Sequence, residues 1–368
     1  MNFKFFIGTK VLFGENCVTE NKNEFKKFGK RAFVVTGKNS GKLSGALDDV
    51  AGVLENLGID YYIFDRVENN PSLENVNEAG REARTFKADF IIGIGGGSPL
   101  DASKAVSVLA VNHIEPKELY SNVFINKPLP IIAIPTTAGT GSEVTPYSIL
   151  TRRDLNTKMS FGNEDTFPQI AFEDARYTYD LPSNVTIDTA VDAFCHAMEG
   201  YLSRRSTPAS DVLAQEAITI FGQCINPLIN GQLDPYVREK LMYMAMLGGM
   251  VISHTGTTII HGMGYSLTYF KDLPHGRANG LFIKEYLKFN YREASGKIDR
   301  MLELLGIAGI DEFGELLEKM LNYNCTFTED ELKQYASLTM KQKSTTYNIR
   351  TAAKQDLFEI MIKSLKAQ

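Results

Sequence analysis

The stretch "IIGIGGGSPLDASKAV" (91–106) decides the fold, because three glycines join a strand-like apolar run to a helical pattern. Gly95–Gly97 carry no Cβ, so their backbone amides can approach a ligand closely. We expect Ser98 to cap the helix, Pro99 to occupy its first position and Asp101 to complete a capping-box-like pair with Ser98. A helix that begins here offers free N–H groups and the positive end of its dipole to a phosphate.

This glycine-rich turn departs from the strict dinucleotide fingerprint G-x-G-x-x-G. Counting from Gly93, the third glycine would stand at position 98, which is serine. A tight strand-to-helix turn without a ligand is therefore the alternative interpretation. A second loop, "PTTAGTGSE" (135–143), sets small hydroxyl and glycine residues after another strand-like run. Two such loops at one sheet edge favour a phosphate-bearing cofactor.

The first half of the chain alternates between strand-like and helical patterns. Strands are expected at 31–37, 60–65, 89–97 and 129–135, and helices at 45–58, 73–88 and 98–110. This alternation predicts a parallel sheet with helices on both faces. In such sheets ligands bind beyond the carboxyl ends of the strands.

The second half changes period from about residue 180. Long segments with 3.6-residue spacing and few strand-like runs predict helices at 186–203, 208–229 and 238–253. The turn-forming stretch 180–184 marks the boundary. We therefore expect an α/β dinucleotide-binding domain over 1–180 and an all-helical, metal-binding and catalytic domain over 181–368.

The bulk composition is that of a globular protein. The 368 residues are 43% hydrophobic and 23% charged, the net charge is −5, and the scattered basic residues argue against a nucleic-acid partner. The run 241–265 lacks Asp, Glu, Lys and Arg, but its His, Ser, Thr and Gly content favours buried helices over a membrane span. Four cysteines without a CxxC pair are interpreted as free thiols. No secretory signal core is present at the N-terminus, so we expect a cytoplasmic protein.

A metal-ligand pattern runs through the second half. Asp192 and His196 are four residues apart, which puts both side chains on one face of a helix. This pair alone is more typical of an Asp–His pair on a helix surface than of a metal site. His261 and His275, which frame a later segment, shift the interpretation toward a metal site. One Asp and three His make an all-N/O ligand set that suits Fe²⁺, Zn²⁺, Mn²⁺ or Ni²⁺. The remaining histidines are interpreted as structural: His113 and His254.

These motifs stand in an order and spacing that resemble a known family. They are "FG" (13–14), "NP" (70–71), "GGGSPLDASK" (95–104), "PTTAGTGSEVT" (135–145), "DAFCHAMEGYLS" (192–203) and "PHG" (274–276). The chain resembles the iron-containing (group III) alcohol dehydrogenases almost from end to end. A tail motif, "YNIRT" (347–351), echoes the family's "NPR" signature with Ile349 in place of proline.

The resemblance implies a fold and two bound groups. The fold is an N-terminal Rossmann-like domain and a C-terminal all-helical domain. Asp192, His196, His261 and His275 are implied to bind one divalent metal, usually Fe²⁺ with Zn²⁺ possible. Together with the glycine-rich turn, the resemblance assigns nicotinamide-cofactor contacts to Asn70, Gly95, Gly96, Gly97, Ser98, Pro99, Leu100, Asp101, Thr136, Thr137, Thr140, Ile149 and Lys158.

The choice of nicotinamide depends on the end of the first strand. Many NAD-preferring members of the family have an aspartate where this chain has Gly37. The stretch 36–42 resembles the loop of NADP-using members, with Lys38 or Lys42 to supply charge and Ser40 to supply a hydroxyl. We therefore predict NADP(H) over NAD(H).

The resemblance also implies the activity, which is hydride transfer between the nicotinamide and a small primary alcohol or diol, as in 1,3-propanediol or butanol dehydrogenases. Most of the family has a histidine relay at the position of Tyr265, and a phenol is a poor base at pH 7. Tyr265 is therefore interpreted either as a catalytic residue that orients substrate or passes a proton, or as a lining residue. A homodimer is expected, paired through an edge hairpin at 3–14. The alternatives are a zinc-dependent glycerol-type dehydrogenase, a dehydroquinate-synthase-like lyase and a non-catalytic dinucleotide sensor.

Overall fold

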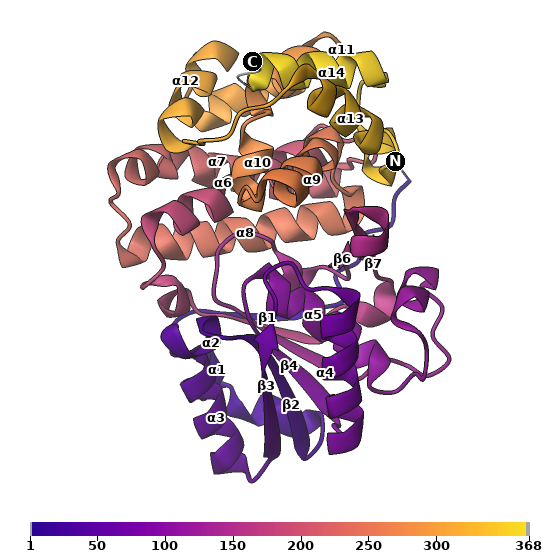
Figure 1. Ribbon diagram of the computed structural model, residues 1–368. Helices are drawn as coiled ribbons and strands as arrows, with labels where there is room; N and C mark the ends of the chain where they lie inside the picture. Colours follow the sequence, from indigo (N-terminus) through magenta and orange to yellow (C-terminus); the bar gives the residue numbers. More distant parts are fainter. Residues whose placement is uncertain (1, 366–368) are drawn as a thin grey trace. The chain divides into compact units, whose positions relative to one another are not determined.

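A computed structural model describes residues 2–365 and divides the chain into two compact units. The α/β unit is Ile7–Leu181, and the helical unit is the rest of the described chain. The few described residues before Ile7 group with the helical unit. Figure 1 shows both units, with the sheet in indigo and purple and the helical unit from magenta-pink to yellow.

The α/β unit is built on a six-stranded sheet in which every neighbouring pair is parallel. In spatial order the strands are β1 (Lys10–Phe13), β8 (Ile170–Glu173), β5 (Ile131–Pro135), β4 (Phe90–Gly95), β2 (Arg31–Gly37) and β3 (Asp60–Val67). The predicted parallel sheet is confirmed. An antiparallel hairpin of β6 (Ser148–Arg152) and β7 (Thr157–Phe161) was not expected from the sequence.

Helices cover both faces of the sheet, as predicted (Figure 1). They are α1 (Cys17–Glu20), α2 (Ser40–Leu43), α3 (Ala46–Leu57), α4 (Leu73–Phe86) and α5 (Gly97–Leu109). Alternate strand residues point to opposite faces. Val34 and Ile92 therefore pack in a core with α3, whereas Val35 and Ile91 pack in a second core with α4 and α5. This double burial explains why these strands read as continuous apolar runs.

The helical unit confirms the predicted change of period. Its helices are α6 (Ser183–Tyr201), α7 (Pro208–Asn230), α8 (Pro235–Thr255), α9 (Ile259–Lys271), α10 (His275–Gly280), α11 (Ile283–Leu305), α12 (Ile310–Met320), α13 (Glu329–Thr339) and α14 (Lys354–Ser364). The short 3₁₀ helices of the two units are η1 (Lys22–Lys27), η2 (Pro116–Ser121), η3 (Ser142–Val144), η4 (Arg153–Leu155), η5 (Glu164–Thr166), η6 (Ala175–Thr178) and η7 (Lys343–Tyr347).

The apolar helices belong to the core of the helical unit. Within the described chain only α7 is long and apolar enough to cross a membrane, by length and composition alone. It packs against α6, α8 and α11, as a core helix does. The uncharged run 241–265 forms the end of α8 and the start of α9, and most of it is buried. A Cβ on Gly248 of α8 would lie 2.9 Å from the carbonyl oxygen of Ala193. This glycine therefore lets α8 approach α6 closely.

Two local expectations were wrong. Among described residues 2–9 there is no strand, and β1 pairs in parallel with β8, so no hairpin spans 3–14. Helix α5 begins at Gly97 with Gly96 as its cap residue, so Ser98 lies inside the first turn. The hydroxyl of Ser98 instead accepts a hydrogen bond from the backbone N–H of Asn70, at 3.1 Å.

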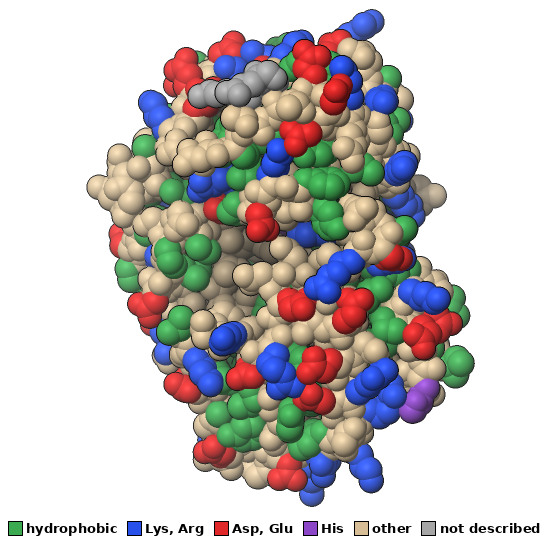
Figure 2. Space-filling view, in the orientation of Figure 1, with side chains coloured by type: hydrophobic (Ala, Val, Ile, Leu, Met, Phe, Trp, Pro, Cys, Tyr) green, Lys and Arg blue, Asp and Glu red, His purple; other side chains and the backbone are tan. Residues whose placement is uncertain are grey.

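The segment before the α/β unit is held by a histidine of α8. The ring of Phe5 stacks on His254 with centroids 4.2 Å apart, and the backbone N–H of Phe6 donates to His254 Nε2 at 2.9 Å. His254 thus has a structural role. Figure 2 shows Lys and Arg side chains interspersed with Asp and Glu over the face in view.

Candidate functional site

Helix α6 carries the first two candidate ligands. Asp192 and His196 are one turn apart, and both side chains are buried. The ring of His196 stacks on that of His261 with centroids 4.8 Å apart. The two residues that the sequence placed on one helix face therefore meet a residue from another helix.

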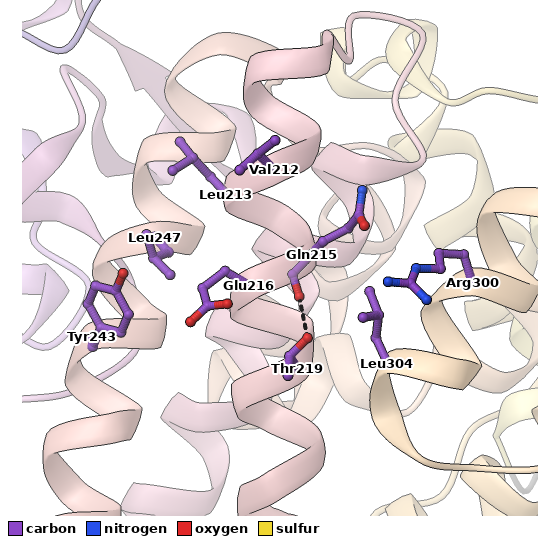
Figure 3. A pocket seen from close by; sticks show the side chains of 9 residues that line it. All are labelled: Val212, Leu213, Gln215, Glu216, Thr219, Tyr243, Leu247, Arg300 and Leu304. Atoms are coloured by element: carbon purple, nitrogen blue, oxygen red, sulfur yellow. Dashed lines mark hydrogen bonds between the residues drawn. The ribbon is translucent and has the colours of Figure 1, made fainter.

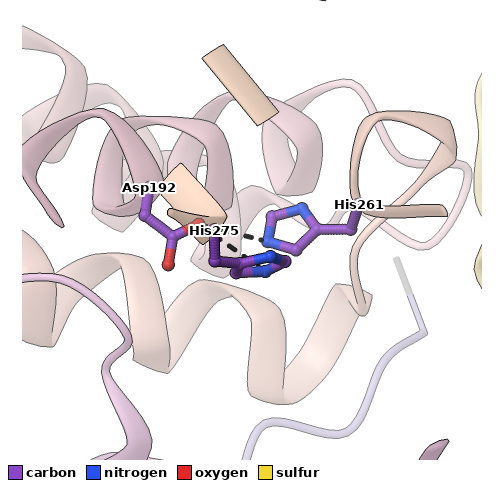
Figure 4. A group of neighbouring side chains, drawn as sticks. All are labelled: Asp192, His261 and His275. Carbon is purple, nitrogen blue, oxygen red and sulfur yellow. Dashed lines mark ion pairs between the residues drawn. The ribbon is translucent and has the colours of Figure 1, made fainter. Parts of the chain in front are cut away.

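Helices α9 and α10 supply the other two histidines. His261 lies in the first turn of α9, and His275 is the first residue of α10, directly after Pro274. Asp192 Oδ1 lies 3.6 Å from His261 Nε2 and 3.9 Å from His275 Nε2. One ligand atom from each of these three residues lies within 4.8 Å of the others, and Figure 4 shows both rings turned toward the carboxylate.

Close contact between α10 and α6 positions His275. A Cβ on Gly276 would lie 1.8 Å from the carbonyl oxygen of Asp188, so only glycine fits at this crossing. The Asp188 carboxylate also accepts a hydrogen bond from Arg277 Nε at 2.8 Å. Next along α10, Asn279 Nδ2 donates to Asp192 Oδ1 at 2.9 Å. These contacts fasten the short helix and orient the Asp192 carboxylate.

Glu199 is a buried residue of this site that sequence reasoning missed. It stands seven residues after Asp192 and three after His196, so the signal was a third polar residue on the same face of α6. Its side chain is fully buried. It accepts hydrogen bonds from the start of α9 and faces His261 Nδ1.

The charges of the cluster are strongly coupled. Burial alone would raise the pKa of Asp192, but the neighbouring His196, His275 and His261 hold it well below its usual range. For His261, burial favours the neutral ring, yet Glu199 and Asp192 together raise its pKa to about 10. Asp192 is therefore an ionised ligand at neutral pH.

The residues present fit a divalent metal. His261 Nε2 is buried and has no hydrogen-bond partner among the described residues, although it faces the Asp192 carboxylate. Buried polar atoms are normally satisfied, so such an atom calls for a partner. Imidazole nitrogens and a carboxylate oxygen suit Fe²⁺ and Zn²⁺, and no thiolate is among them.

Tyr265 lies against this cluster. It is one turn after His261 on α9, and its half-buried ring stacks on His275 with centroids 5.5 Å apart and an interplanar angle of 12°. Thr268 Oγ1 lies 3.5 Å from His275 Nδ1. The tyrosine therefore touches a candidate ligand directly.

In the α/β unit, the candidate cofactor residues gather around the glycine-rich turn. Asn70 links to Ser98 through its N–H, and its Oδ1 accepts from Lys158 Nζ at 2.6 Å. A Cβ on Gly97 would meet the methyl carbon of Thr140 at 2.7 Å, so the two loops touch. Thr137 and Thr140 are half-buried, whereas the side chains of Pro99, Leu100 and Thr136 are buried.

A buried ionic network supports the same turn. Asp101 Oδ2 accepts from the backbone N–H of Ile149 at 2.9 Å, and Oδ1 accepts from Ser142 Oγ at 2.5 Å. Lys104, which sequence reasoning did not assign, is fully buried and donates to Ser142 Oγ and to the carbonyl of Tyr147. The carboxylate of Asp101 therefore faces the protein interior.

Two buried carboxyl groups lie at the base of the second loop. Burial raises the pKa of Glu143 to about 7 and that of Glu173, at the end of β8, well above its usual range. The two groups are hydrogen-bonded to each other. Such a pair is stable only when one member holds a proton.

The end of β2 carries the residues expected to choose the nicotinamide. Gly37 is the last residue of the strand, and a Cβ there would lie 3.1 Å from Ser40 Oγ at the start of α2. Lys38, the next residue, and Lys42, within α2, are both exposed. Lysine and hydroxyl side chains therefore surround this strand end.

A groove of about 490 Å³ lies elsewhere in the helical unit (Figure 3). It is formed by α7, α8 and α11 and lined by Val212, Leu213, Gln215, Glu216, Thr219, Tyr243, Leu247, Arg300 and Leu304. None of these residues belongs to the histidine cluster, so this groove is separate from the candidate metal site.

The comparisons with known proteins agree with both units. The family model described as iron-containing alcohol dehydrogenase matches residues 8–175, and the C-terminal model of the Fe-containing alcohol dehydrogenase family matches 186–365. The crystal structure of an iron-containing alcohol dehydrogenase from Thermotoga maritima is 38% identical, with a TM-score of 0.93 over 99% of each chain.

Curated relatives are more distant. Sulfoacetaldehyde reductase from Bilophila wadsworthia is 34% identical over 293 residues, which are 79% of this chain and 76% of the relative. NADPH-dependent butanol dehydrogenase from Clostridium saccharobutylicum is 30% identical over 324 residues, 87% of this chain and 82% of the relative.

Fold, histidine cluster and relatives together define an oxidoreductase that acts on CH–OH groups and uses a metal and a nicotinamide cofactor. The chain belongs to the iron-containing alcohol dehydrogenase family.

Proposed function

We propose that Asp192, His196, His261 and His275 bind one divalent metal, Fe²⁺ in the cell with Zn²⁺ as a competent substitute. The observation that carries this proposal is the buried His261 Nε2, which lacks a hydrogen-bond partner among described residues and lies 3.6 Å from Asp192 Oδ1. The ring of His196, stacked on His261, supports a fourth ligand at the same point. When bound, the metal and the nicotinamide supply a Lewis acid for the substrate oxygen and a hydride donor or acceptor.

The chain's own residues then bind and orient the reactants. We propose that Gly37, Asn70, Gly95–Asp101, the loop threonines and Lys158 hold the nicotinamide dinucleotide, with free N–H groups of α5 at its pyrophosphate. The buried side chains of Pro99, Leu100 and Asp101 support backbone contacts there rather than side-chain contacts. Lys38 and Ser40 favour NADP(H), because a cation and a hydroxyl suit a 2′-phosphate.

Tyr265 is our candidate for the proton relay. Its ring lies against His275, so a phenol hydroxyl near the substrate oxygen can donate or pass a proton through a hydrogen bond. A tyrosine that only lines the pocket would leave the pH dependence of kcat unchanged upon removal of its hydroxyl.

The substrate class we propose is small primary alcohols, diols and their aldehydes. The name of the butanol-dehydrogenase relative supports alcohols of this size, whereas that of the sulfoacetaldehyde reductase points to a charged aldehyde. A zinc-dependent glycerol-type dehydrogenase remains a second candidate, because the same N/O ligands bind Zn²⁺. A dinucleotide sensor without turnover is the third, and it would leave the buried ligand set without a task.

One experiment tests these proposals together. The enzyme is reconstituted with Fe²⁺ or Zn²⁺ without oxygen, and turnover is measured on an alcohol and aldehyde panel with NADPH/NADP⁺ and NADH/NAD⁺. We expect turnover with Fe²⁺ and a higher kcat/KM for NADP(H). A clear preference for NADH would overturn the cofactor proposal, and dinucleotide binding without turnover would support the sensor.

Two histidine variants test the ligand set. We expect His261→Ala to lose metal and activity while the α/β unit stays folded. His113→Ala is the matched control, because that exposed histidine lies in the α/β unit, where its Nδ1 is hydrogen-bonded to Arg84 Nη1. Full activity of His261→Ala would overturn the metal assignment.

We also propose a cytoplasmic homodimer. Strand β1 lies at an edge of the sheet, and Phe3, Phe5, Phe6 and Phe13 are exposed near it in the sequence. An edge strand and exposed aromatic residues are both suited to association. Sedimentation of the full chain and of Phe3→Ser tests this, and a monomer at micromolar concentration would contradict it.

A further inference from the structure

Glu199 is a fully buried carboxylate without a lysine or arginine partner among the described residues. A buried charge is tolerated only when hydrogen bonds compensate it. Its Oε1 accepts from Thr258 N at 2.8 Å, Thr258 Oγ1 at 2.7 Å and Ile260 N at 3.1 Å. These donors form the start of α9, where the helix dipole also favours a negative charge.

The second carboxylate oxygen has a different task. Oε2 faces His261 Nδ1 within hydrogen-bond distance. An ionised carboxylate only accepts hydrogen bonds, so Nδ1 must carry the proton. When the ring gives up its other proton to bind a metal, the lone pair is left on Nε2, and Nε2 is the atom that faces Asp192 Oδ1 at 3.6 Å.

We propose that Glu199 is a positioning residue of the metal centre, which holds His261 in the tautomer whose Nε2 is free to bind the metal. This inference rests on the proposed function, because it takes His261 as a ligand. Hydrogen bonds from metal-bound histidines to carboxylates fix ring orientation and typically change metal affinity about 10- to 100-fold. A residue that merely caps α9 would not have this effect.

The isosteric variant Glu199→Gln separates the two roles. Four donors hold Oε1, so the amide carbonyl keeps that place and the NH₂ group turns toward His261 Nδ1. Nδ1 must then accept, and the proton moves to Nε2, which no longer binds a metal. The capping contacts to α9 stay intact. Thr258→Val is the matched control, because it removes one Oε1 donor and leaves the Oε2–Nδ1 contact untouched.

Two measurements test whether Glu199 positions His261. Apo protein is titrated with Zn²⁺ against a chromophoric chelator, and ¹⁵N NMR of histidine-labelled apo protein, recorded above pH 10 where the His261 ring is neutral, shows whether Nδ1 carries the proton. We expect Glu199→Gln to bind Zn²⁺ about 10- to 100-fold more weakly and to lose the Nδ1 proton. Thr258→Val should keep the proton and bind Zn²⁺ within about threefold of wild type.

Unchanged Zn²⁺ affinity and a retained Nδ1 proton in Glu199→Gln would overturn the inference. If Glu199→Gln does not fold, Glu199→Asp takes its place, because the shortened carboxylate retreats from Nδ1. Wild-type affinity in that variant would overturn the inference equally. Failure of the proposed function looks different: wild type and His261→Ala would then bind Zn²⁺ equally, while the NMR measurement, which needs no metal, still tests Glu199.

Discussion

Replacing Gly276 by alanine tests whether contact between α10 and α6 sets the metal site. The new Cβ would lie 1.8 Å from Asp188 O and 2.9 Å from Asp192 Cβ, whereas real Cβ contacts essentially never fall below 3.0 Å. The helices must therefore separate by roughly 1.2 Å, because backbone atoms cannot rotate away. His275, the neighbouring residue, moves with α10.

The size of this shift gives the expected loss. Metal–ligand distances hold within about ±0.2 Å. A shift of roughly 1.2 Å therefore removes His275 from a common coordination sphere. We expect Zn²⁺ affinity to fall at least about tenfold. Because a misplacement of about 1 Å can cost about 100-fold in rate, kcat/KM with Fe²⁺ should fall by about that factor or more. Overpacking should lower the free energy of unfolding by about 1–3 kcal/mol.

The assay compares Gly276→Ala with Gly296→Ala. Gly296 lies on the exposed face of α11, and a Cβ there meets nothing within 4 Å. The control should therefore gain about 0.5–1 kcal/mol and keep its activity. Far-ultraviolet circular dichroism checks that both variants are folded. Wild-type Zn²⁺ affinity together with kcat/KM within twofold in Gly276→Ala would refute the reasoning.

Three further predictions concern other parts of the molecule. Glu143 has a pKa raised from 4.5 to about 7, so its protonated form stabilises the fold; this contribution is full below pH 4.5 and is lost as pH rises through about 7. Glu143→Gln should therefore flatten the fall in thermal midpoint between pH 5 and 8, and an unchanged slope would contradict this. Asp101→Asn leaves the fully buried Lys104 without its carboxylate and should cost about 3–5 kcal/mol in chemical unfolding; a loss below about 1 kcal/mol would mean that Lys104 is neutral. Tyr265→Phe keeps the stacking on His275 but should lower kcat at least about tenfold and alter the alkaline limb of the pH–rate profile, without weakening Zn²⁺ binding.

Much of the fold was predictable because its main elements have strong local patterns. Strands β2, β4 and β5 are buried on both sides and α6 to α8 repeat every 3.6 residues, so each could be recognised by itself. Strand β1 could not, because it is four residues long and its partner, β8, lies about 160 residues away. The β6–β7 hairpin was missed because its polar residues carry no clear alternation.

The site was predictable in its residue types but not in its supports. The motifs predicted Asp192 and three histidines as ligands because their order matched a known family, and the ligand atoms of Asp192, His261 and His275 do lie together. Glu199 and Asn279 were missed because their roles depend on contacts between helices far apart in the sequence. The expected cap at Ser98 failed for a related reason: its hydroxyl is engaged by Asn70, 28 residues earlier.

The contact of Phe5 and Phe6 with His254 has a consequence for biosynthesis. The ribosome makes these phenylalanines before the α/β unit, but makes His254 only after that unit ends at Leu181. At a synthesis rate of about 5–20 residues per second, the interval between the synthesis of Leu181 and that of His254 is roughly 4 to 15 seconds. During this time the α/β unit can fold while the segment ahead of it still lacks its docking histidine. Phe5 and Phe6 can therefore dock only after His254, near the end of α8, has been synthesised.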